Sequence, residues 1–351
     1  MRLPDAARAA LDDAVAGGAV PGGVAAVVDA QGRVEVHHAG VTRHGGPPVR
    51  ATTRYDLASL TKVVATLPCI LRLVSDGAVR LDDRLGHFFG NAGWFQTPSL
   101  ADVTIRQLLT HTAGLPAWEP LFARVSDRLT ARGAVLQASV VAAAGVVYSD
   151  LGFMLLGALV ERVSGRRLDR AAADLVFEPL GMRRTCFGPI DTDDVAATED
   201  CGWRGRLLIG EVHDENAAVW DGVAGHAGLF GDALDLTRYA AAWLRRDPLL
   251  AERAVLDAAL GEHARAADGS ARGLGWLLAS PGAFAGVVRG AGHSGFTGTS
   301  LWLDADAGVA SVVLTNRVHP TRHGGAGIGE LRRRFHGAVH APARWQGTGD
   351  A

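Results

Sequence analysis

One lysine occurs in the whole chain, and it stands three residues after a serine. Lys62 closes the segment Ser59-Leu60-Thr61-Lys62, while every other strongly basic residue is an arginine. A guanidinium stays protonated in proteins, whereas an ammonium can be desolvated, lose its proton and act as a base. A serine hydroxyl needs such a neighbouring base to become a nucleophile. The pair therefore indicates a serine nucleophile with a lysine base, although a surface lysine beside an unrelated serine would look the same.

The spacing of this pair is helical. The pattern of residues 59–75 predicts a helix, with a kink expected at Pro68. Ser59 then lies at the start of the helix, and Lys62 falls one turn later on the same face. We expect burial to lower the pKa of the Lys62 ammonium, and the helix N-terminus to favour negative charge developing at Ser59.

Two later segments could complete an acyl-transfer site. Tyr148-Ser149-Asp150 could supply a second acid/base group, although Tyr148 could equally be a core tyrosine. His293-Ser294-Gly295-Phe296 precedes a predicted strand, whose edge could supply an oxyanion donor and bind substrate. The alternative for this second segment is a glycine-rich turn. The conjunction of all three segments in one chain favours chemistry over coincidence.

Composition places the chain among globular proteins and excludes several classes. It has 351 residues, 48% hydrophobic and 21% charged, with a formal net charge of −2 and a pI near 6.7. This balance offers no electrostatic attraction for nucleic acid or an anionic membrane. The three cysteines, Cys69, Cys186 and Cys201, form no CxxC pair, which argues against a disulfide scaffold and a structural zinc.

The chain shows no targeting or membrane segment. The N-terminus lacks a basic region followed by an apolar one, so we expect a cytoplasmic protein without a secretory signal. The apolar stretch 139–160 is interrupted by residues 148–150, which leaves runs shorter than the roughly 20 residues of a membrane span. A buried helix-turn-helix is expected there instead.

The order of predicted elements suggests one domain, 1–351, built from two lobes. Helices are predicted at both ends, and hairpins follow the first helix and precede the last. Between them, up to about residue 265, the pattern consists of short helices and loops. The two ends are therefore expected to meet in one sheet. These predictions give helices at 5–16, 106–110 and 331–339, hairpins at 24–28/34–36 and 299–303/309–314, an α/β lobe at about 1–58 and 266–340, and a mainly helical lobe at about 59–265.

These motifs together resemble the β-lactamase-related serine hydrolases, which include class C β-lactamases, DD-peptidases and family VIII-type esterases. The resemblance covers nearly the whole chain and extends to Leu108–Leu115 (LLTHTAGL), Glu178–Met182 (EPLGM) and Thr299–Trp302 (TSLW). It implies an α/β (α+β) fold of the β-lactamase/transpeptidase type. In that fold an antiparallel sheet is flanked by helices, and the active site lies between the sheet and a mainly helical lobe.

The resemblance also implies roles for residues of this chain. Ser59 would be acylated, Lys62 and Tyr148 would handle protons, and water would release the acyl group. The backbone N–H groups of Ser59 and Phe296 would form the oxyanion hole. Ser294 and Gly295 would contact substrate, and no cofactor or metal would be needed.

Two positions depart from the family pattern. Asp150 stands where lactamases and DD-peptidases usually carry asparagine, which replaces a possible amide donor by an acceptor. His293 stands where they usually carry lysine, and a neutral imidazole attracts a substrate carboxylate less than an ammonium does. Both changes argue against an efficient β-lactamase and are more similar to the esterase, aminopeptidase and amidase branches.

A further block of motifs resembles a subgroup associated with muropeptide breakdown. It comprises residues 210–217, 223–230 and 315–320. His213, Asp214 and His226 could suggest a metal site, but a hydrogen-bonded loop at the rim of the cleft is the favoured interpretation. Asn316 and Arg317 are candidate substrate-binding residues, and a structural ion pair is an equal alternative for Arg317.

The sequence thus predicts a serine hydrolase that cleaves an amide or ester through a Ser59 acyl-enzyme. The expected substrates are small molecules or peptides of the muropeptide or D-amino-acid type. Alternatives are a broad carboxylesterase, a class C-like β-lactamase or DD-peptidase, and a non-catalytic sensor of cell-wall fragments. A pure binder has no need of a lysine base, which argues against the last. The oligomeric state is left open.

Overall fold

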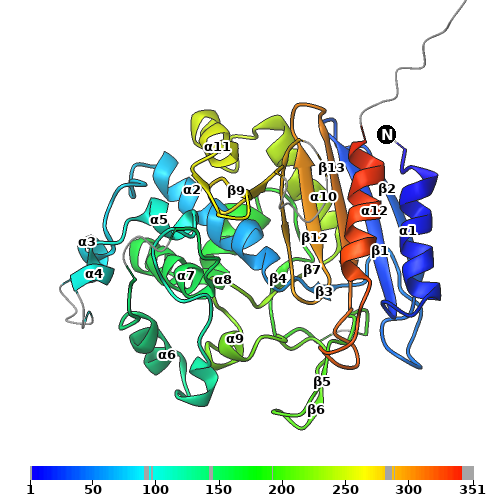
Figure 1. Ribbon diagram of the computed structural model, residues 1–351, viewed down its shortest axis with the longest axis horizontal. Helices are drawn as coiled ribbons and strands as arrows, with labels where there is room; N and C mark the ends of the chain where they lie inside the picture. The colour runs from blue at the N-terminus through cyan, green and yellow to red at the C-terminus, as the bar shows by residue number, and fades with distance from the viewer. Residues whose placement is uncertain are drawn as a thin grey trace, which may run out of the picture.

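The computed structural model describes residues 2–90, 95, 98–141, 145–191, 193–280, 287 and 289–341. A central antiparallel sheet separates a pair of helices on one side from a larger, mostly helical region on the other (Figure 1). The strands are β1 (Gly22–Asp29), β2 (Val34–Gly40), β3 (Tyr55–Asp56), β4 (Cys186–Phe187), β5 (Asp200–Cys201), β6 (Arg206–Leu207), β7 (Leu229–Gly231), β8 (Ala264–Arg265), β9 (Ala271–Arg272), β10 (Leu277–Leu278), β11 (Ala291–Ser294), β12 (Ser300–Asp304) and β13 (Val309–Thr315).

The main sheet joins the two ends of the chain. Its eight strands follow the order β2-β1-β13-β12-β11-β10-β9-β8. The first strand, β1, pairs with the last, β13, along its length, with Gly23 opposite Thr315 and Asp29 opposite Val309. The predicted hairpins are present as β1–β2 and β12–β13. The expectation that both ends of the chain meet in one sheet is therefore confirmed.

Helices cover both faces of this sheet, and others lie beyond it. The described helices are α1 (Asp5–Ala16), α2 (Leu67–Ser75), α3 (Leu85–Phe89), α4 (Pro98–Ala101), α5 (Ile105–Leu109), α6 (Arg128–Val135), α7 (Asp150–Ser164), α8 (Leu168–Ala172), α9 (Glu215–Val219), α10 (Ala233–Arg245), α11 (Arg253–Leu260) and α12 (Ile328–His340). Of these, α1 and α12 pack on one face of the sheet and α10 on the other. Because the side chains of a strand alternate between the two faces of the sheet, β1 contributes residues to the hydrophobic core on each face. Ala25 and Val27 pack against α1 and α12, while Val24, Ala26 and Val28 join the larger core.

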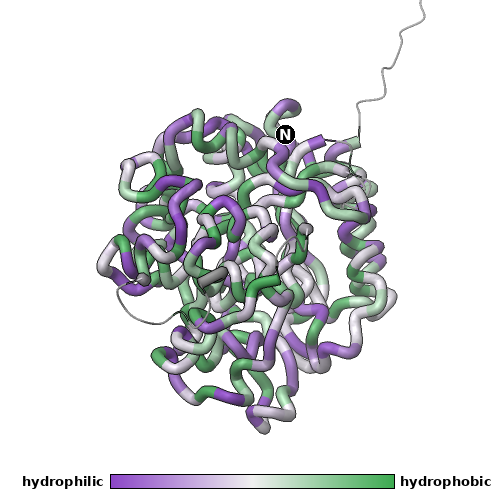
Figure 2. The backbone as a smooth tube through the Cα atoms, turned by 60° about the vertical axis from the view of Figure 1, so that its left-hand side comes forward, coloured by the Kyte–Doolittle hydropathy of each residue, from purple (hydrophilic) through white to green (hydrophobic). Residues whose placement is uncertain are grey.

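The larger core lies between the sheet and the helical region. Helix α10 packs against β1 and β13, and α7 is buried over most of its length. Helix α10 falls within 59–265, so part of the range expected for the helical lobe covers the sheet directly. The division into two lobes stays a prediction. Figure 2 shows hydrophobic stretches alternating with hydrophilic ones along the chain, as expected for helices and strands that bury one face.

Two local predictions differ from the structure. The helix after Ser59 contains a π-helical turn at Lys62–Thr66 that the sequence did not predict, and Pro68 follows it at the start of α2. The helix-turn-helix expected at 139–160 is wrong in its first half. Helix α7 begins only at Asp150, because Ser149 caps its N-terminus, and residues 139–141 and 145–149 are not helical. Residues 142–144 lie outside the described part of the chain.

Within the described residues, no helix combines the length and the apolarity that a bilayer span requires. The cytoplasmic location expected from the sequence stays a prediction.

The contact between α7 and the loop before β7 gives a test of this packing. A Cβ atom on Gly225 would lie 1.9 Å from the backbone carbonyl oxygen of Phe153 in α7. The backbone of one of these two segments would have to shift to make room for it. Gly225→Ala should therefore lower the free energy of unfolding by about 1–3 kcal/mol, as overpacking does. Gly337 in α12 has no atom near such a Cβ, so Gly337→Ala should raise it by roughly 0.5–1 kcal/mol. Urea unfolding of both variants measures the two shifts, and equal shifts would contradict the packing.

Candidate active site

The segment before Ser59 is held in a strained conformation. Strand β3 leads into Ala58, which has a φ of 47°, in the left-handed region that residues other than glycine rarely adopt. The Asp56 carboxylate stabilises this turn by accepting the Ala58 N–H at 2.8 Å. The helix begins directly afterwards, because the Lys62 N–H donates to the Ser59 carbonyl at 3.1 Å. Ser59 thus lies at the helix N-terminus, as predicted from the pattern.

Lys62 is completely buried, and three oxygen atoms surround its ammonium. Nζ lies 2.9 Å from Ser59 Oγ, 2.7 Å from Asp150 Oδ1 and 3.3 Å from the His226 carbonyl oxygen. The Tyr148 ring lies 5.0 Å away, measured from Nζ to the ring centroid. The structure therefore brings Ser59, Lys62, Tyr148 and Asp150 together from segments about 90 residues apart.

The expected lowering of the Lys62 pKa is wrong. Burial does lower this pKa, but the neighbouring Asp150 carboxylate and Tyr148 more than offset the effect and hold the pKa above its ordinary value. The sequence argument considered desolvation alone. Because Asp150 stands 2.7 Å from Nζ, Lys62 is an ammonium in the resting site, and Asp150 is its counter-ion.

Tyr148 is held between two histidine rings. Its ring centroid lies 4.6 Å from that of His111 and 5.9 Å from that of His293. The loop around Tyr148 is bound to His111 by two hydrogen bonds: Val147 N–H donates to its carbonyl at 2.8 Å, and Ser149 N–H donates to Nδ1 at 3.1 Å. His111 belongs to the LLTHTAGL motif, and sequence reasoning had not given it this positioning role.

His293 is a neutral histidine at the end of β11. Burial, together with the positive charges of Lys62 and Arg272, lowers its pKa to about 3. Its Nδ1 lies 2.9 Å from the Ser294 carbonyl oxygen, which can only accept, so Nδ1 carries the proton. His293 therefore cannot supply the positive charge of the lysine that relatives usually carry at this position.

Two backbone segments meet at the candidate oxyanion hole. Thr297 Oγ1 donates to the Asp56 carbonyl at 2.7 Å, and Thr299 Oγ1 donates to the Leu57 carbonyl at 3.0 Å. The approach is so close that a Cβ on Gly295 would lie 2.5 Å from the Leu57 carbonyl oxygen. Among the described residues, none accepts a hydrogen bond from the Ser59 N–H or the Phe296 N–H, so both remain available to a ligand.

Of the two candidate residues after β13, one lies outside the site. Asn316 is buried, and its side-chain amide donates to the carbonyls of Thr42 at 2.9 Å and Ala197 at 3.2 Å. The prediction that Asn316 binds substrate is therefore wrong, because its donors hold two loops together. Arg317 does line the cavity, and its Nε donates to the Phe296 carbonyl at 2.7 Å.

Two histidines of the muropeptide-type block pair with carboxylates. His213 Nε2 lies 3.0 Å from Glu199 Oε2, and His226 Nε2 lies 2.9 Å from Asp214 Oδ1. Asp214 also caps α9 by accepting the Ala217 N–H. Across the described ranges, no group of three or more histidine, cysteine, aspartate or glutamate side chains is placed to hold a metal ion.

These residues surround a cavity of about 810 Å³. Its lining includes Ser59, Tyr148, Asp150, His293, Ser294, Gly295 and Phe296, together with Trp118 and four arginines, Arg272, Arg317, Arg322 and Arg332. Arg272, on β9, was missed by sequence reasoning, because nothing in its neighbourhood distinguishes it from the many other arginines. Its guanidinium lies 5.9 Å from the Tyr148 ring centroid.

Known proteins are similar to this chain along most of its length. The model of the Beta-lactamase family matches residues 7–331. A protein of Salmonella schwarzengrund named "Putative D-alanyl-D-alanine carboxypeptidase" is 30% identical over 319 residues, which cover 78% of this chain and 72% of the relative.

Solved structures share the fold at lower identity. D-amino acid amidase from Ochrobactrum anthropi SV3, in complex with D-phenylalanine, has a TM-score of 0.75 at 21% identity and covers 96% of this chain and 99% of its own. EstCE1, a hydrolase with promiscuous acyltransferase activity, has a TM-score of 0.73 at 23% identity and covers 96% and 98%.

The chain belongs to the β-lactamase family of serine hydrolases. This confirms the resemblance seen in the sequence and the predicted β-lactamase/transpeptidase-type fold. Members of this family act on small-molecule or peptide substrates.

The neutral state of His293 generates a prediction about acid stability. Between about pH 6.5, the ordinary histidine value, and the folded pKa of about 3, the unfolded chain binds a proton that the folded protein excludes. The free energy of unfolding should therefore fall as the pH falls through this window, by about 1.4 kcal/mol per pH unit for this group. His293→Asn should make the slope shallower by about one proton, measured by urea unfolding from pH 4 to 6. An unchanged slope would contradict the neutral state.

Proposed function

We propose that the protein hydrolyses amide or ester bonds through a Ser59 acyl-enzyme, acting on muropeptide-like peptides that end in a D-amino acid. The observation that carries this proposal is the 2.9 Å contact between Lys62 Nζ and Ser59 Oγ beside the cavity. A completely buried ammonium is costly, so its placement beside a serine hydroxyl argues for chemistry. The name of the Salmonella relative supports a D-alanine peptide as the substrate class.

In the proposed reaction, Ser59 Oγ attacks the substrate carbonyl carbon. The negative charge that develops on the carbonyl oxygen is stabilised by the N–H groups of Ser59 and Phe296. The bond to the leaving group then breaks, and Tyr148 gives its proton to the departing nitrogen or oxygen. Tyr148 regains a proton from Asp150 through Lys62, so the proton lost by Ser59 leaves with the product. Water attacks the acyl-enzyme in the second half, and its proton is returned to Ser59.

Asp150 has a specific place in this proton transfer. Lys62 rests as an ammonium, so it can accept the Ser59 proton only by giving up one of its own. Asp150 Oδ1, at 2.7 Å, is the neighbouring carboxylate that can receive it. We therefore assign Lys62 the role of a proton relay between Ser59 and Asp150, in place of the free lysine base expected from the sequence.

The substrate carboxylate is assigned to Arg272. Three of the four cavity arginines are engaged: Arg317 and Arg332 donate to backbone carbonyls, and Arg322 pairs with carboxylates. By contrast, no described residue accepts a hydrogen bond from the Arg272 guanidinium, and its Nε is buried. A half-buried guanidinium without a protein acceptor can bind a carboxylate through two parallel hydrogen bonds. His293 is uncharged and cannot compete for this role.

A carboxylesterase is the second candidate. The neutral imidazole of His293 favours it, because a site without a positive charge at this position selects peptide acids less strongly over uncharged esters. A class C-like β-lactamase or DD-peptidase requires the carboxylate contact that we assign to Arg272. A non-catalytic sensor would not need the buried Lys62.

The nucleophile and the relay are tested by substitution. Ser59→Ala should leave the protein folded and lower kcat by several orders of magnitude, because the nucleophile is lost. Lys62→Arg should be nearly as damaging as Lys62→Ala, because a guanidinium does not exchange its proton at working pH. Initial rates on a p-nitrophenyl ester and a D-alanyl peptide measure both effects, with thermal unfolding as the folding control. A Ser59→Ala variant that keeps more than about a tenth of kcat would sink the assignment.

The carboxylate assignment predicts a substrate-dependent loss. Arg272→Gln should lower kcat/KM about tenfold to a hundredfold for a peptide with a free C-terminal carboxylate, the range of a hydrogen bond to a charged group. The same peptide with an amidated C-terminus should lose much less. Arg265→Gln, on the neighbouring strand β8, is the matched control, since Arg265 pairs with Glu262 away from the cavity. Equal losses on the acid and the amide would refute the assignment and favour the esterase.

A further inference from the structure

Phe296 supplies one of the two candidate oxyanion N–H groups, yet its own side chain is half exposed at 50%. Two side chains hold the ring. His213 stacks on it with 5.8 Å between ring centroids and 27° between planes, and the Arg317 guanidinium lies 4.4 Å from the centroid. A half-exposed phenylalanine would otherwise change rotamer freely, and these two contacts hold its ring in one orientation.

His213 contacts both segments of the candidate oxyanion hole. Its ring packs on Phe296, and its backbone N–H donates to Asp56 Oδ2 at 2.6 Å. The other oxygen of Asp56 accepts the Ala58 N–H, directly before Ser59. His213 thus contacts Phe296 through its side chain. Through its backbone it contacts Asp56, which holds the turn before Ser59.

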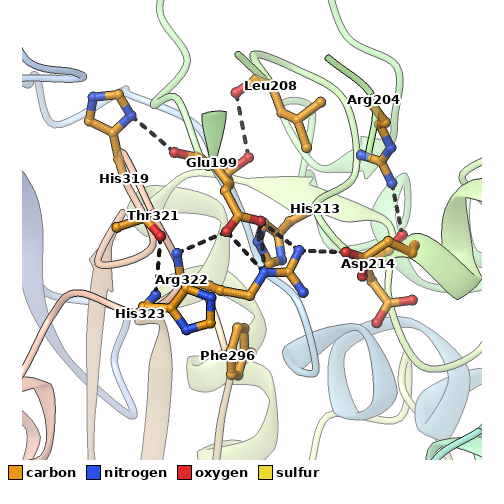
Figure 3. Close-up of polar contacts among 12 residues, drawn as sticks. Glu199, Arg204, Leu208, His213, Asp214, Phe296, His319, Thr321, Arg322 and His323 are labelled. Carbon is orange, nitrogen blue, oxygen red and sulfur yellow. Dashed lines mark hydrogen bonds and ion pairs between the residues drawn. The ribbon is translucent and has the colours of Figure 1, made fainter. Parts of the chain in front are cut away.

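The orientation of the His213 ring is fixed from outside the cavity. Figure 3 shows Glu199 between His213 and Arg322, with Phe296 beneath them. Arg322 donates to the Glu199 carboxylate through its backbone N–H at 2.9 Å and its Nε at 2.8 Å, and it also pairs with Glu215. These contacts join the stretch before β5, the start of α9 and the loop after β13.

The charge on Glu199 decides which nitrogen of His213 carries a proton. Burial raises the Glu199 pKa, but hydrogen bonds from Arg322 and the charge of His213 more than offset this and lower it to about 2. The carboxylate is therefore ionised and only accepts, so His213 Nε2 carries the proton shared with it. The histidine ring is held in one plane by this bond, face to face with Phe296.

From these contacts we infer that His213 is a positioning residue of the oxyanion hole, with Glu199 and Arg322 as its support. The inference rests on the proposed function, because it needs Ser59 and Phe296 to bind the developing oxyanion. It assigns a role to a residue for which the sequence offered only a metal ligand or a loop contact. His213 acts through Phe296 and Asp56 and does not itself react.

Two substitutions at His213 separate its ring from its hydrogen bond. His213→Phe keeps an aromatic ring on Phe296 and loses the bond to Glu199, whereas His213→Gln keeps a donor for Glu199 and loses the ring. His213→Gln should lower kcat about tenfold to a hundredfold with KM nearly unchanged, part of the loss seen when an oxyanion donor is removed outright. His213→Phe should retain more of kcat and lose more thermal stability, because the buried Glu199 carboxylate loses one of its donors and keeps only Arg322.

Glu161→Gln is the matched control for Glu199→Gln. Both carboxylates are largely buried, with 12% and 8% of the side chain exposed, and both pair with an arginine. Glu161 pairs with Arg128 and does not line the cavity. Both changes should lower the melting temperature, but Glu199→Gln alone should also lower kcat.

Inhibition by a boronic acid distinguishes a role in the oxyanion hole from a purely structural role. Its tetrahedral adduct with a serine places an oxygen in the oxyanion hole, so the inhibition constant of phenylboronic acid reports on the hole directly. For His213→Gln this constant should rise by about the same factor as kcat/KM falls. An adduct with wild-type affinity, or a loss confined to KM, would overturn the inference while leaving the proposed function standing. A wild-type enzyme that forms no adduct would overturn the proposed function, and the inference with it.

Discussion

The arrangement of the site depends on one buried positive charge. The Lys62 ammonium is wholly removed from solvent, and such a charge persists only when it is paired and hydrogen-bonded. Its partners come from three parts of the chain: Ser59 on its own helix, Asp150 at the start of α7 and the His226 carbonyl before β7. The helical region must therefore be assembled correctly before the charge is satisfied.

This charge sets the electrostatics of the cavity around it. Burial, together with the positive charges of Lys62 and Arg272, lowers the pKa values of the neighbouring histidines, His111 and His293, and keeps both rings neutral. Under the proposed function, a neutral His293 leaves the recognition of the substrate carboxylate to Arg272. The replacement of asparagine by Asp150 and of lysine by His293 is thus one change in charge distribution: a negative charge is added beside Lys62, and a positive charge is removed from β11.

The backbone of the site is held by a second set of contacts, which runs between distant segments. The turn before Ser59 is tied to the 295–299 turn by Thr297 and Thr299, and both turns are tied to His213. Strain at Ala58, in the left-handed region, persists because the Asp56 carboxylate and these neighbours over-determine it. Glu199 and Arg322, which touch neither Ser59 nor Lys62, extend this frame to the loop after β13.

The sequence by itself determined the local features of this protein. The Ser59-to-Lys62 spacing placed both side chains on one helical face. Runs of β-forming residues separated by turn residues identified the two hairpins, and their places near the two chain ends predicted one joining sheet. Such features depend on residues that are close in the sequence, and the side-chain periods of a helix and a strand make them visible in the sequence. The family motifs then identified Tyr148, His293 and Phe296, which line the same cavity.

Only the tertiary structure decided the charges and partners of these residues. The direction of the Lys62 pKa depends on Asp150, 88 positions later in the sequence, and no local pattern reports that 2.7 Å contact. For the same reason Asn316, promising by its place after β13, proved to hold two loops, while the unremarkable Arg272 entered the cavity. Electrostatic energies depend on distance and burial in space, and folding brings together groups whose separation along the chain carries no signal.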